Sequence, residues 1–189
     1  MRALLPNFFS FNSAKDLIRI GRDYDGGYLV SQADIEKSDC LIGLGINDDW
    51  SFEEDFLSLK KVEIYAYDAS VSKKYFVKQF IKSILSINNF KKIPHWFKTL
   101  VKYINFFSKP NIHHIKKFVG LNSESELFCT FLEVLNKANH KNVFLKIDIE
   151  GFEYRFLDDI VANQNKLTGM VIELHDCDLH LKEIKKFIK

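Results

Sequence analysis

Short β-forming runs alternate with amphipathic helical segments along most of this chain, and this alternation restricts the fold more than any other feature. Segments with apolar residues at every third or fourth position separate most of the runs. Strands that alternate with helices form βαβ units, so we predict an α/β fold with a parallel sheet and helices on both faces. The five runs are CLIGLGI, VEIYAYD, KKFVGL, VFLKIDI and GMVIEL.

A hairpin and several helices complete the predicted order of elements. The stretch IRIGRDYDGGYLV predicts two short strands around a turn at Asp25-Gly26-Gly27, because glycine adopts the positive φ that tight turns need. Ser123 and Glu126 form a capping-box pattern at the start of a strong helix. Helices are predicted over 50–59, 75–87, 94–107 and 123–139, from near residue 153, and over 179–189.

The bulk composition is that of an ordinary globular protein. The chain has 189 residues, of which 47% are hydrophobic and 28% charged, and this length suits one domain spanning residues 1–189. No apolar run is long enough to cross a membrane, and the N-terminus lacks a signal-peptide pattern. Three cysteines that lie far apart (Cys40, Cys129 and Cys177) indicate reduced thiols and a cytoplasmic location.

Charge is distributed unevenly along the chain. Residues 71–117 contain eleven lysines and no Asp or Glu, while the other 16 basic residues stand with all 25 acidic ones, a net charge of −9. We interpret this segment as a helical insert rich in lysine and aromatic residues. It suits a lid that completes the core, a contact with the inner membrane surface where a lipid-linked saccharide is found, or a site for an acidic saccharide. Nucleic acid is not expected, because no arginines accompany the lysines.

Polar residues gather where the predicted strands end. Ligands of open α/β sheets bind beyond the carboxyl ends of the strands. Gly43, Gly45 and Asn47 follow the first strand, although the third glycine of a dinucleotide fingerprint is missing. Asp68 ends the second strand about twenty residues later, where a carboxylate can accept both hydroxyls of a ribose. A helix cap or a solvated loop acid is the alternative for Asp68.

A second acidic group follows the fourth strand, in FLKIDIEGFE. Strand alternation places Asp148 and Glu150 on the same side as Lys146. Either the lysine pairs with one acid and Glu150 caps the next helix, or the group holds a ligand amine, a metal or a substrate hydroxyl. His175 lies just after the fifth strand, in ELHDCDLH, whose spacing matches no common metal-ligand pattern, so we predict no metal there. His113-His114 is likewise interpreted as part of a lysine-rich loop.

Four blocks of the sequence together resemble a known family. RIGRDYDGGYLV, GLGINDDWSFEEDF, YAYD and LKIDIEGFEYRFLDDI are similar, in the same order, to the FkbM-like class of S-adenosylmethionine-dependent methyltransferases. The fourth block is the most specific, because members typically carry a K-x-D-x-E-G-x-E run. The resemblance spans about residues 18 to 175. It implies a Rossmann-like class I methyltransferase sheet and O-methylation, often of a sugar hydroxyl on a surface glycan or secondary metabolite.

The resemblance also implies roles for individual residues. Gly43 and Gly45, with Asn47 beside them, would line S-adenosylmethionine, and Asp68 would bind its ribose. Asp148, with Glu150, would sit beside the sulfonium and the acceptor. A sugar hydroxyl is a very weak acid, so a base within hydrogen-bond reach is needed. Asp148, Glu150 and His175 are the catalytic candidates.

The predicted sheet departs from the family pattern at its end. Sheets of this class normally continue past the fifth strand with two more strands, which this sequence does not supply. We therefore expect about five parallel strands, with the fifth covered by a partner, by a second copy in a homodimer, or by the N-terminal strands. The alternative functions are a truncated, non-catalytic Rossmann-like domain that associates with a partner, and a nicotinamide-dependent enzyme.

Overall fold

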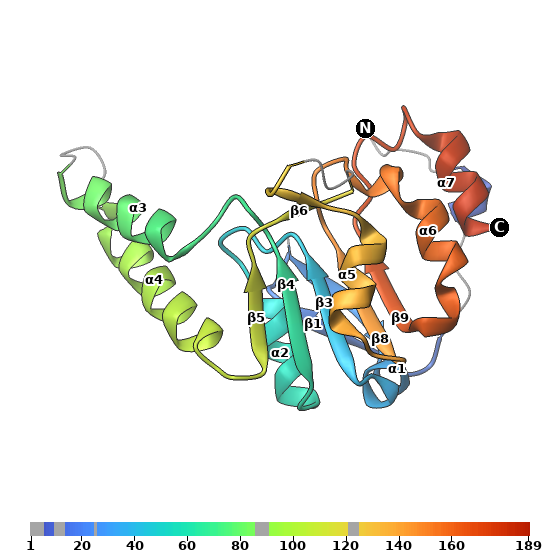
Figure 1. Ribbon diagram of the computed structural model, residues 1–189, viewed down its shortest axis with the longest axis horizontal. Helices are drawn as coiled ribbons and strands as arrows, with labels where there is room; N and C mark the ends of the chain where they lie inside the picture. Colours follow the sequence, from blue (N-terminus) through green and yellow to red (C-terminus); the bar gives the residue numbers. More distant parts are fainter. Residues whose placement is uncertain (1–5, 10–13, 25, 86–90, 121–124) are drawn as a thin grey trace.

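A five-stranded parallel sheet forms the centre of the molecule. The computed structural model describes residues 6–9, 14–24, 26–85, 91–120 and 125–189 (Figure 1). The strand order is β5-β4-β3-β8-β9, so the first strand of the sheet in the chain lies in the middle, and the order reverses between β3 and β8. This confirms the predicted α/β, Rossmann-like architecture. The strands are β3 (Cys40–Leu44), β4 (Glu63–Tyr67), β5 (Ile112–Ile115), β8 (Val143–Ile147) and β9 (Leu167–Ile172).

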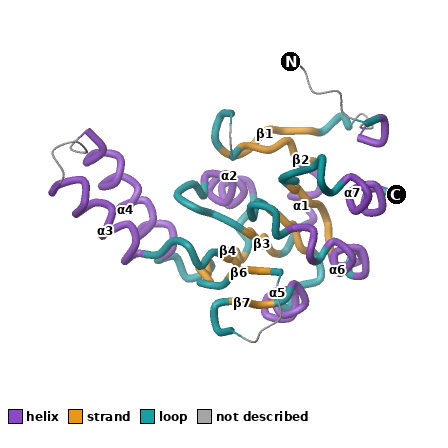
Figure 2. Tube along the Cα trace, turned by 90° about the horizontal axis from the view of Figure 1, so that it is seen from above, coloured by secondary structure: helices purple, strands orange, loops and turns teal. Residues whose placement is uncertain are grey.

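Two apolar clusters, one on each face of the sheet, form the core. Neighbouring side chains of a strand point to opposite faces, so Leu41 belongs to one cluster and Ile42 to the other. The first cluster includes side chains from α1 (Gln32–Lys37) and α2 (Ser51–Leu59), and the second includes side chains from α5 (Phe131–Ala138) and α6 (Leu157–Ala162). The helices therefore cover both faces, as Figure 2 shows from above.

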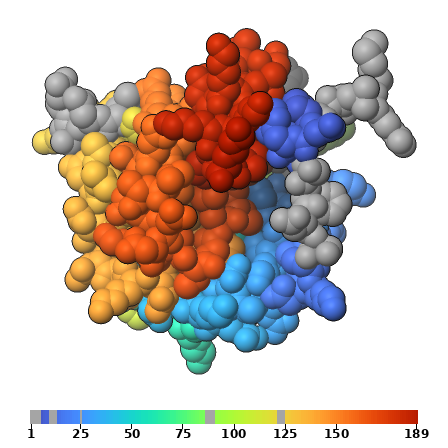
Figure 3. Space-filling model, turned by 90° about the vertical axis from the view of Figure 1, so that its right-hand side faces the viewer, coloured from blue at the N-terminus to red at the C-terminus, as the bar shows by residue number. Residues whose placement is uncertain are grey.

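The N-terminal hairpin lies against the β9 side of the sheet. β1 (Leu17–Gly21) pairs antiparallel with β2 (Gly27–Ser31), as predicted, and Gly26 in the turn has a φ of +82°, while Asp25 lies outside the described residues. β2 and α1 both contact β9, which is the outer strand of the sheet. Near the other end of the chain, α7 (Leu181–Ile188) lies beside the blue N-terminal residues in Figure 3. N-terminal elements thus pack against β9, which is one of the three coverings expected from the sequence.

The lysine-rich segment forms a helical hairpin. α3 (Lys73–Leu85) and α4 (Ile93–Phe107) pack together and extend outward from the β5 edge of the sheet (Figures 1 and 2). Both helices were predicted within a few residues, and residues 86 and 87 of the first prediction lie outside the described residues. Among the described residues, no helix has the length and apolar character that a membrane crossing requires.

Two local predictions are wrong. The third strand of the sheet is β5, which contains His113 and His114, and not KKFVGL, which contributes only the short β6 (Phe118–Val119). The imidazole of His114 accepts a hydrogen bond from the Tyr103 hydroxyl (2.6 Å) and donates one to the Asp68 carbonyl (2.9 Å). Burial lowers the pKa of His114, so the neutral ring suits this strand.

The second error concerns the start of α5. Phe128 and Cys129 form the short strand β7, which pairs with β6, and the helix begins only at Phe131. Its capping box is made by Thr130 and Glu133, three residues apart as in the predicted pair. Glu126 precedes this strand, and Ser123 lies outside the described residues.

Candidate active site at the carboxyl ends of the strands

A cavity of about 720 Å³ opens at the carboxyl ends of the central strands. Its volume falls in the range of about 300–1,000 Å³ that small-molecule sites occupy. Six residues predicted from the sequence line it together: Gly45, Asn47, Asp68, Asp148, Glu150 and His175. Asp68 and Asp148 therefore share one hollow, as a common ligand would require.

The seventh predicted residue, Gly43, lies next to the buried Glu53 side chain and not at the cavity. A Cβ atom at this position would lie 2.6 Å from Oε1 of Glu53, a buried residue of α2. Gly43 is not among the residues that line the cavity. Its lack of a side chain leaves room for the Glu53 carboxylate inside the protein.

Gly45 holds two strand ends in close contact. It has a φ of +81°, and a Cβ atom there would lie 1.7 Å from the Asp148 carbonyl oxygen. Its amide donates to the Tyr67 carbonyl (2.9 Å), and its own carbonyl accepts from Nζ of Lys146 (2.9 Å). Only glycine allows this conformation and this approach together, so Gly45 brings the β3 loop against the end of β8.

Asp68 braces the loop after β3. Its Oδ2 accepts from the amides of Ile46 (3.0 Å) and Asn47 (2.8 Å). Its Oδ1 accepts from the amide (2.7 Å) and hydroxyl (2.5 Å) of Ser70. A carboxylate has about four lone-pair directions, and four donors of the chain use them. A ribose hydroxyl can therefore reach Oδ1 only by taking the place of the Ser70 hydroxyl, which can rotate away.

Replacing Asp68 with asparagine should lower the free energy of unfolding by about 1–2 kcal/mol, because the amide nitrogen of asparagine cannot accept the bonds that one carboxylate oxygen accepts. Urea denaturation at constant m-value measures this loss. Ser70→Ala is the matched control, since it removes only one of the four donors and should cost less. An Asp68→Asn protein as stable as the wild type would contradict this bracing role.

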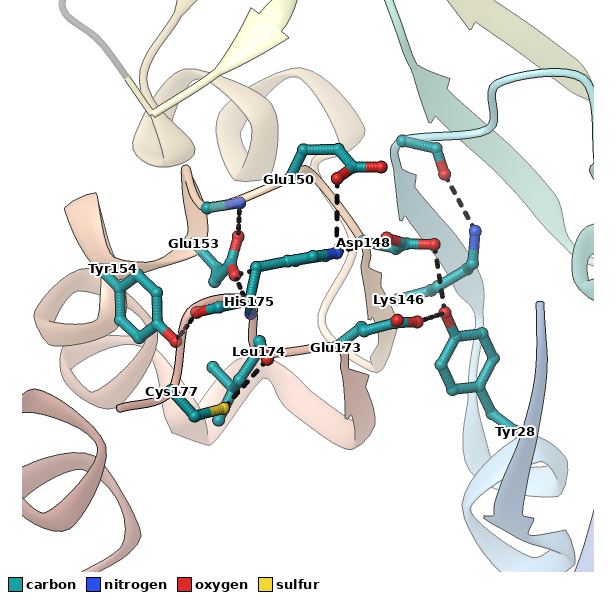
Figure 4. Close-up of polar contacts among 12 residues, drawn as sticks. Tyr28, Lys146, Asp148, Glu150, Glu153, Tyr154, Glu173, Leu174, His175 and Cys177 are labelled. Atoms are coloured by element: carbon teal, nitrogen blue, oxygen red, sulfur yellow. Dashed lines mark hydrogen bonds and ion pairs between the residues drawn. The ribbon is translucent and has the colours of Figure 1, made fainter. Parts of the chain in front are cut away.

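His175 stands in the centre of the acidic group. Its Nδ1 lies 3.1 Å from Oε1 of Glu153, which also accepts the His175 amide (2.8 Å) (Figure 4). Its Nε2 lies 3.6 Å from Oε2 of Glu150 and 3.8 Å from Oδ1 of Asp148. Partial burial alone would lower the pKa of His175, but the hydrogen bond to Glu153 and the three surrounding carboxylates together raise it. Two of the predicted catalytic candidates, Asp148 and Glu150, thus lie within ion-pair distance of the imidazole of the third, His175.

The chain reverses sharply after β8 to bring Glu153 beneath this histidine. Glu150 has a φ of +54° and Gly151 a φ of +92°, and the Gly151 amide donates to Oε2 of Glu153 (2.9 Å). The Glu153 side chain is fully buried. Oε2 of Glu153 therefore fixes the turn, and Oε1 fixes the imidazole of His175. The Glu150 side chain is 85% exposed and faces the opening of the cavity.

Tyr28 links Asp148 to a further carboxylate, that of Glu173. Its hydroxyl lies 2.9 Å from Oε2 of Glu173 and 3.2 Å from Oδ2 of Asp148 (Figure 4). Burial and these two carboxylates strongly raise the pKa of Tyr28, so the phenol keeps its proton as a hydrogen-bond donor. This residue comes from β2 of the N-terminal hairpin, which thereby contributes to the site.

A buried ion pair joins Lys146, which lines the cavity, to Glu53. Nζ of Lys146 is 3.6 Å from Oε1 of Glu53, and the two side chains are 4% and 0% exposed. Neither carboxylate oxygen of Glu53 has a hydrogen-bond partner among the described residues. Burial raises the pKa of Glu53, and the charge of Lys146 opposes that rise. Lys146 thus pairs with an acid of α2, and not with Asp148 or Glu150.

The same group has a spacing that could hold a metal ion. Asp148, Glu173 and His175 each offer a ligand atom within 4.8 Å of the other two. The sequence contains no pattern for this set, because it combines residues of two different strand ends. The Tyr28 hydroxyl lies within hydrogen-bond distance of both carboxylates, so the protein itself supplies this pair with one donor.

The walls of the cavity differ in character. Six acidic residues line the cavity, compared with three lysines and arginines, which are Arg22, Lys117 and Lys146. Arg22 forms an ion pair with Asp49, and Lys146 forms one with Glu53. Another part of the wall is apolar and includes Phe118, Phe128 and Phe152. Such a cavity suits a ligand with positive charge and a flat apolar ring. The six acids are Asp48, Asp49, Asp68, Asp148, Glu150 and Glu173.

The chain matches no family model, no curated protein and no solved structure closely enough to indicate a relative. Four residues that complete the site, Tyr28, Glu53, Glu153 and Glu173, were not among the predicted site residues. Glu173 and Glu153 had a sequence indication, since one follows the fifth strand and the other belongs to the K-x-D-x-E-G-x-E run. Tyr28 and Glu53 also lie in blocks that carry the resemblance, RIGRDYDGGYLV and GLGINDDWSFEEDF, but no pattern predicts their contacts, because these join elements far apart in the chain.

Proposed function

We propose that this protein binds S-adenosylmethionine and is an O-methyltransferase that acts on a hydroxyl, with a saccharide or surface glycan as the expected acceptor. The observation that carries the proposal is the single cavity that Gly45, Asp68, Asp148 and His175 share. The four-block resemblance to FkbM-like enzymes supports the same cofactor. We also propose that the protein is cytoplasmic and contacts the inner face of the membrane.

The residues of the cavity fit this cofactor in three respects. Its carboxylates suit the sulfonium and the ammonium group, while its phenylalanines suit the adenine. Asp68 could hold the ribose once the Ser70 hydroxyl turns away. The same carboxylates would repel the pyrophosphate of a nicotinamide dinucleotide, which disfavours that alternative.

When bound, S-adenosylmethionine supplies an activated methyl group whose leaving group is a neutral thioether. The chain must align an acceptor hydroxyl and remove its proton. His175 suits this task, because Glu153 holds Nδ1 as a donor and Nε2 then presents its lone pair. Asp148 and Glu150 stabilise the imidazolium that forms.

Calorimetry with S-adenosylmethionine and with its demethylated product tests the proposal. We expect both to bind, and Asp148→Asn to weaken binding about tenfold through the loss of one carboxylate charge. Asp158→Asn is the control, because Asp158 is exposed, pairs with Lys186 and does not line the cavity. Absence of binding would favour the non-catalytic, partner-associated domain, and tighter binding of a nicotinamide dinucleotide would favour the other alternative. Either result would overturn the proposal.

A further inference from the structure

The outer face of α3 combines an apolar stripe with lysines. Ile81, Ile84 and Leu85 are 47%, 52% and 79% exposed, and together with Val77 they recur at the three-to-four spacing of one helix face. The opposite face carries the buried Phe76 and Ser83 and packs on α4. Lysines border the stripe, and the four of α3 are Lys73, Lys74, Lys78 and Lys82.

The apolar stripe continues onto α4. The rings of Phe80 and Phe97 contact each other across the hairpin, with centroids 5.6 Å apart. Phe80 lies one helical turn from Val77 and Ile84, and Phe97 is itself 54% exposed. One apolar strip therefore spans both helices, on a hairpin that projects from the body of the protein (Figure 1).

Few acidic side chains of the protein neutralise the lysines of this surface. Residues 71–117 contain no Asp or Glu, and among the described residues none of the four α3 lysines forms an ion pair. Lys102 of α4 is different, since its Nζ lies 3.6 Å from Glu54 of α2. The exposed lysines of α3 would repel one another, and a negatively charged surface would relieve this repulsion.

From this combination we propose that the α3–α4 hairpin docks on an anionic lipid surface. Lysine stems can lie along the apolar strip while their ammonium groups reach the lipid phosphates, and Ile81, Leu85 and Phe97 enter the acyl boundary. A nucleic acid would meet the charge but not the apolar strip, and the hairpin has no arginine to stack on bases. The docking needs neither the cavity nor its ligand, so its test is independent of methyl transfer.

Sedimentation of the full chain with vesicles tests this docking. We expect binding to an equal mixture of phosphatidylcholine and phosphatidylglycerol, weaker binding at high salt, and little binding to phosphatidylcholine alone. Lys74→Gln with Lys78→Gln should weaken binding about 25-fold, at about fivefold for each lysine removed. Ile81→Ser with Leu85→Ser should also weaken it, by removing the inserted apolar groups.

The matched control changes the same charge elsewhere. Lys182→Gln with Lys185→Gln alters two exposed lysines of α7, outside the hairpin, and should leave vesicle binding within about twofold of the wild type. Circular dichroism of each variant verifies that it is folded. Three results would overturn the proposal. The first is equal binding to both kinds of vesicle, and the second is an equal loss of binding in the α7 control. The third is that RNA displaces the protein from the vesicles at a lower concentration than free phosphatidylglycerol does.

Discussion

Replacing Lys146 with methionine is expected to lower the free energy of unfolding by about 3–5 kcal/mol, because a buried carboxylate then loses its counter-ion. The Glu53 side chain is fully buried, and Nζ of Lys146 at 3.6 Å is the cation that compensates it. Methionine keeps most of the length and volume of lysine but not its charge. It also leaves the Gly45 carbonyl without its donor at 2.9 Å. Urea denaturation at pH 7 measures the loss.

Two variants separate the charge effect from other effects. Lys61→Met changes an exposed lysine and should alter stability by no more than about 0.5 kcal/mol. Lys146→Met combined with Glu53→Leu removes both charges, and the double variant should be more stable than Lys146→Met alone. A double variant no more stable than the single one would show that packing, and not the unpaired carboxylate, explains the loss.

The loss in Lys146→Met should also depend on pH. Burial raises the pKa of Glu53 in the folded state above its ordinary value of 4.5, and removal of the lysine raises it further. A carboxyl whose folded pKa is raised contributes most to stability below its unfolded pKa, and this contribution disappears as the pH rises through the folded pKa. The deficit of the variant should therefore be smallest near pH 4 and grow toward neutrality. A deficit independent of pH would contradict this account.

The regular part of the fold follows from local patterns. Apolar runs of β-formers predict four of the five sheet strands, because strands buried on both faces must be apolar along their whole length. The third strand was missed, since its two histidines look polar in sequence. The contact of His114 with Tyr103 and the Asp68 carbonyl makes it compatible with the interior, and such a partner appears only in three dimensions.

The helix start at Phe131 shows a different limit. Residues 123–126 and 130–133 both carry the capping-box pattern, so the sequence alone does not choose between them. The choice depends on Phe128 and Cys129, which pair with β6 and so cannot belong to the helix.

The candidate site was predictable where residues follow strands. The carboxyl ends of parallel strands meet at one edge of the sheet, which is why Asp68, Asp148 and His175 come together. What could not be predicted is how they are compensated. Asp68 is satisfied by four donors of its own chain, and the Asp148 carboxylate is bonded by Tyr28 from a hairpin 120 residues away in sequence.

Replacing Gly45 with alanine is expected to lower the free energy of unfolding by about 2–5 kcal/mol. A left-handed backbone costs a residue with a Cβ about 1–2 kcal/mol, and forcing an extra group into a packed interior costs about 1–3 kcal/mol. Both apply at Gly45, which has a φ of +81° and a Cβ position 1.7 Å from the Asp148 carbonyl. Thermal and urea unfolding measure the sum.

Gly151 provides the matched control, because it has a similar φ of +92° but nothing within 4 Å of the Cβ position. Gly151→Ala should therefore show only the backbone cost of about 1–2 kcal/mol. The difference between the two variants isolates the contact of the β3 loop with the end of β8. Equal losses would mean that this contact is not tight. If the difference is found, Gly45→Ala should also lose ligand binding where it remains folded, because relief of the clash must move Gly45 away from Asp148, and both residues line the cavity.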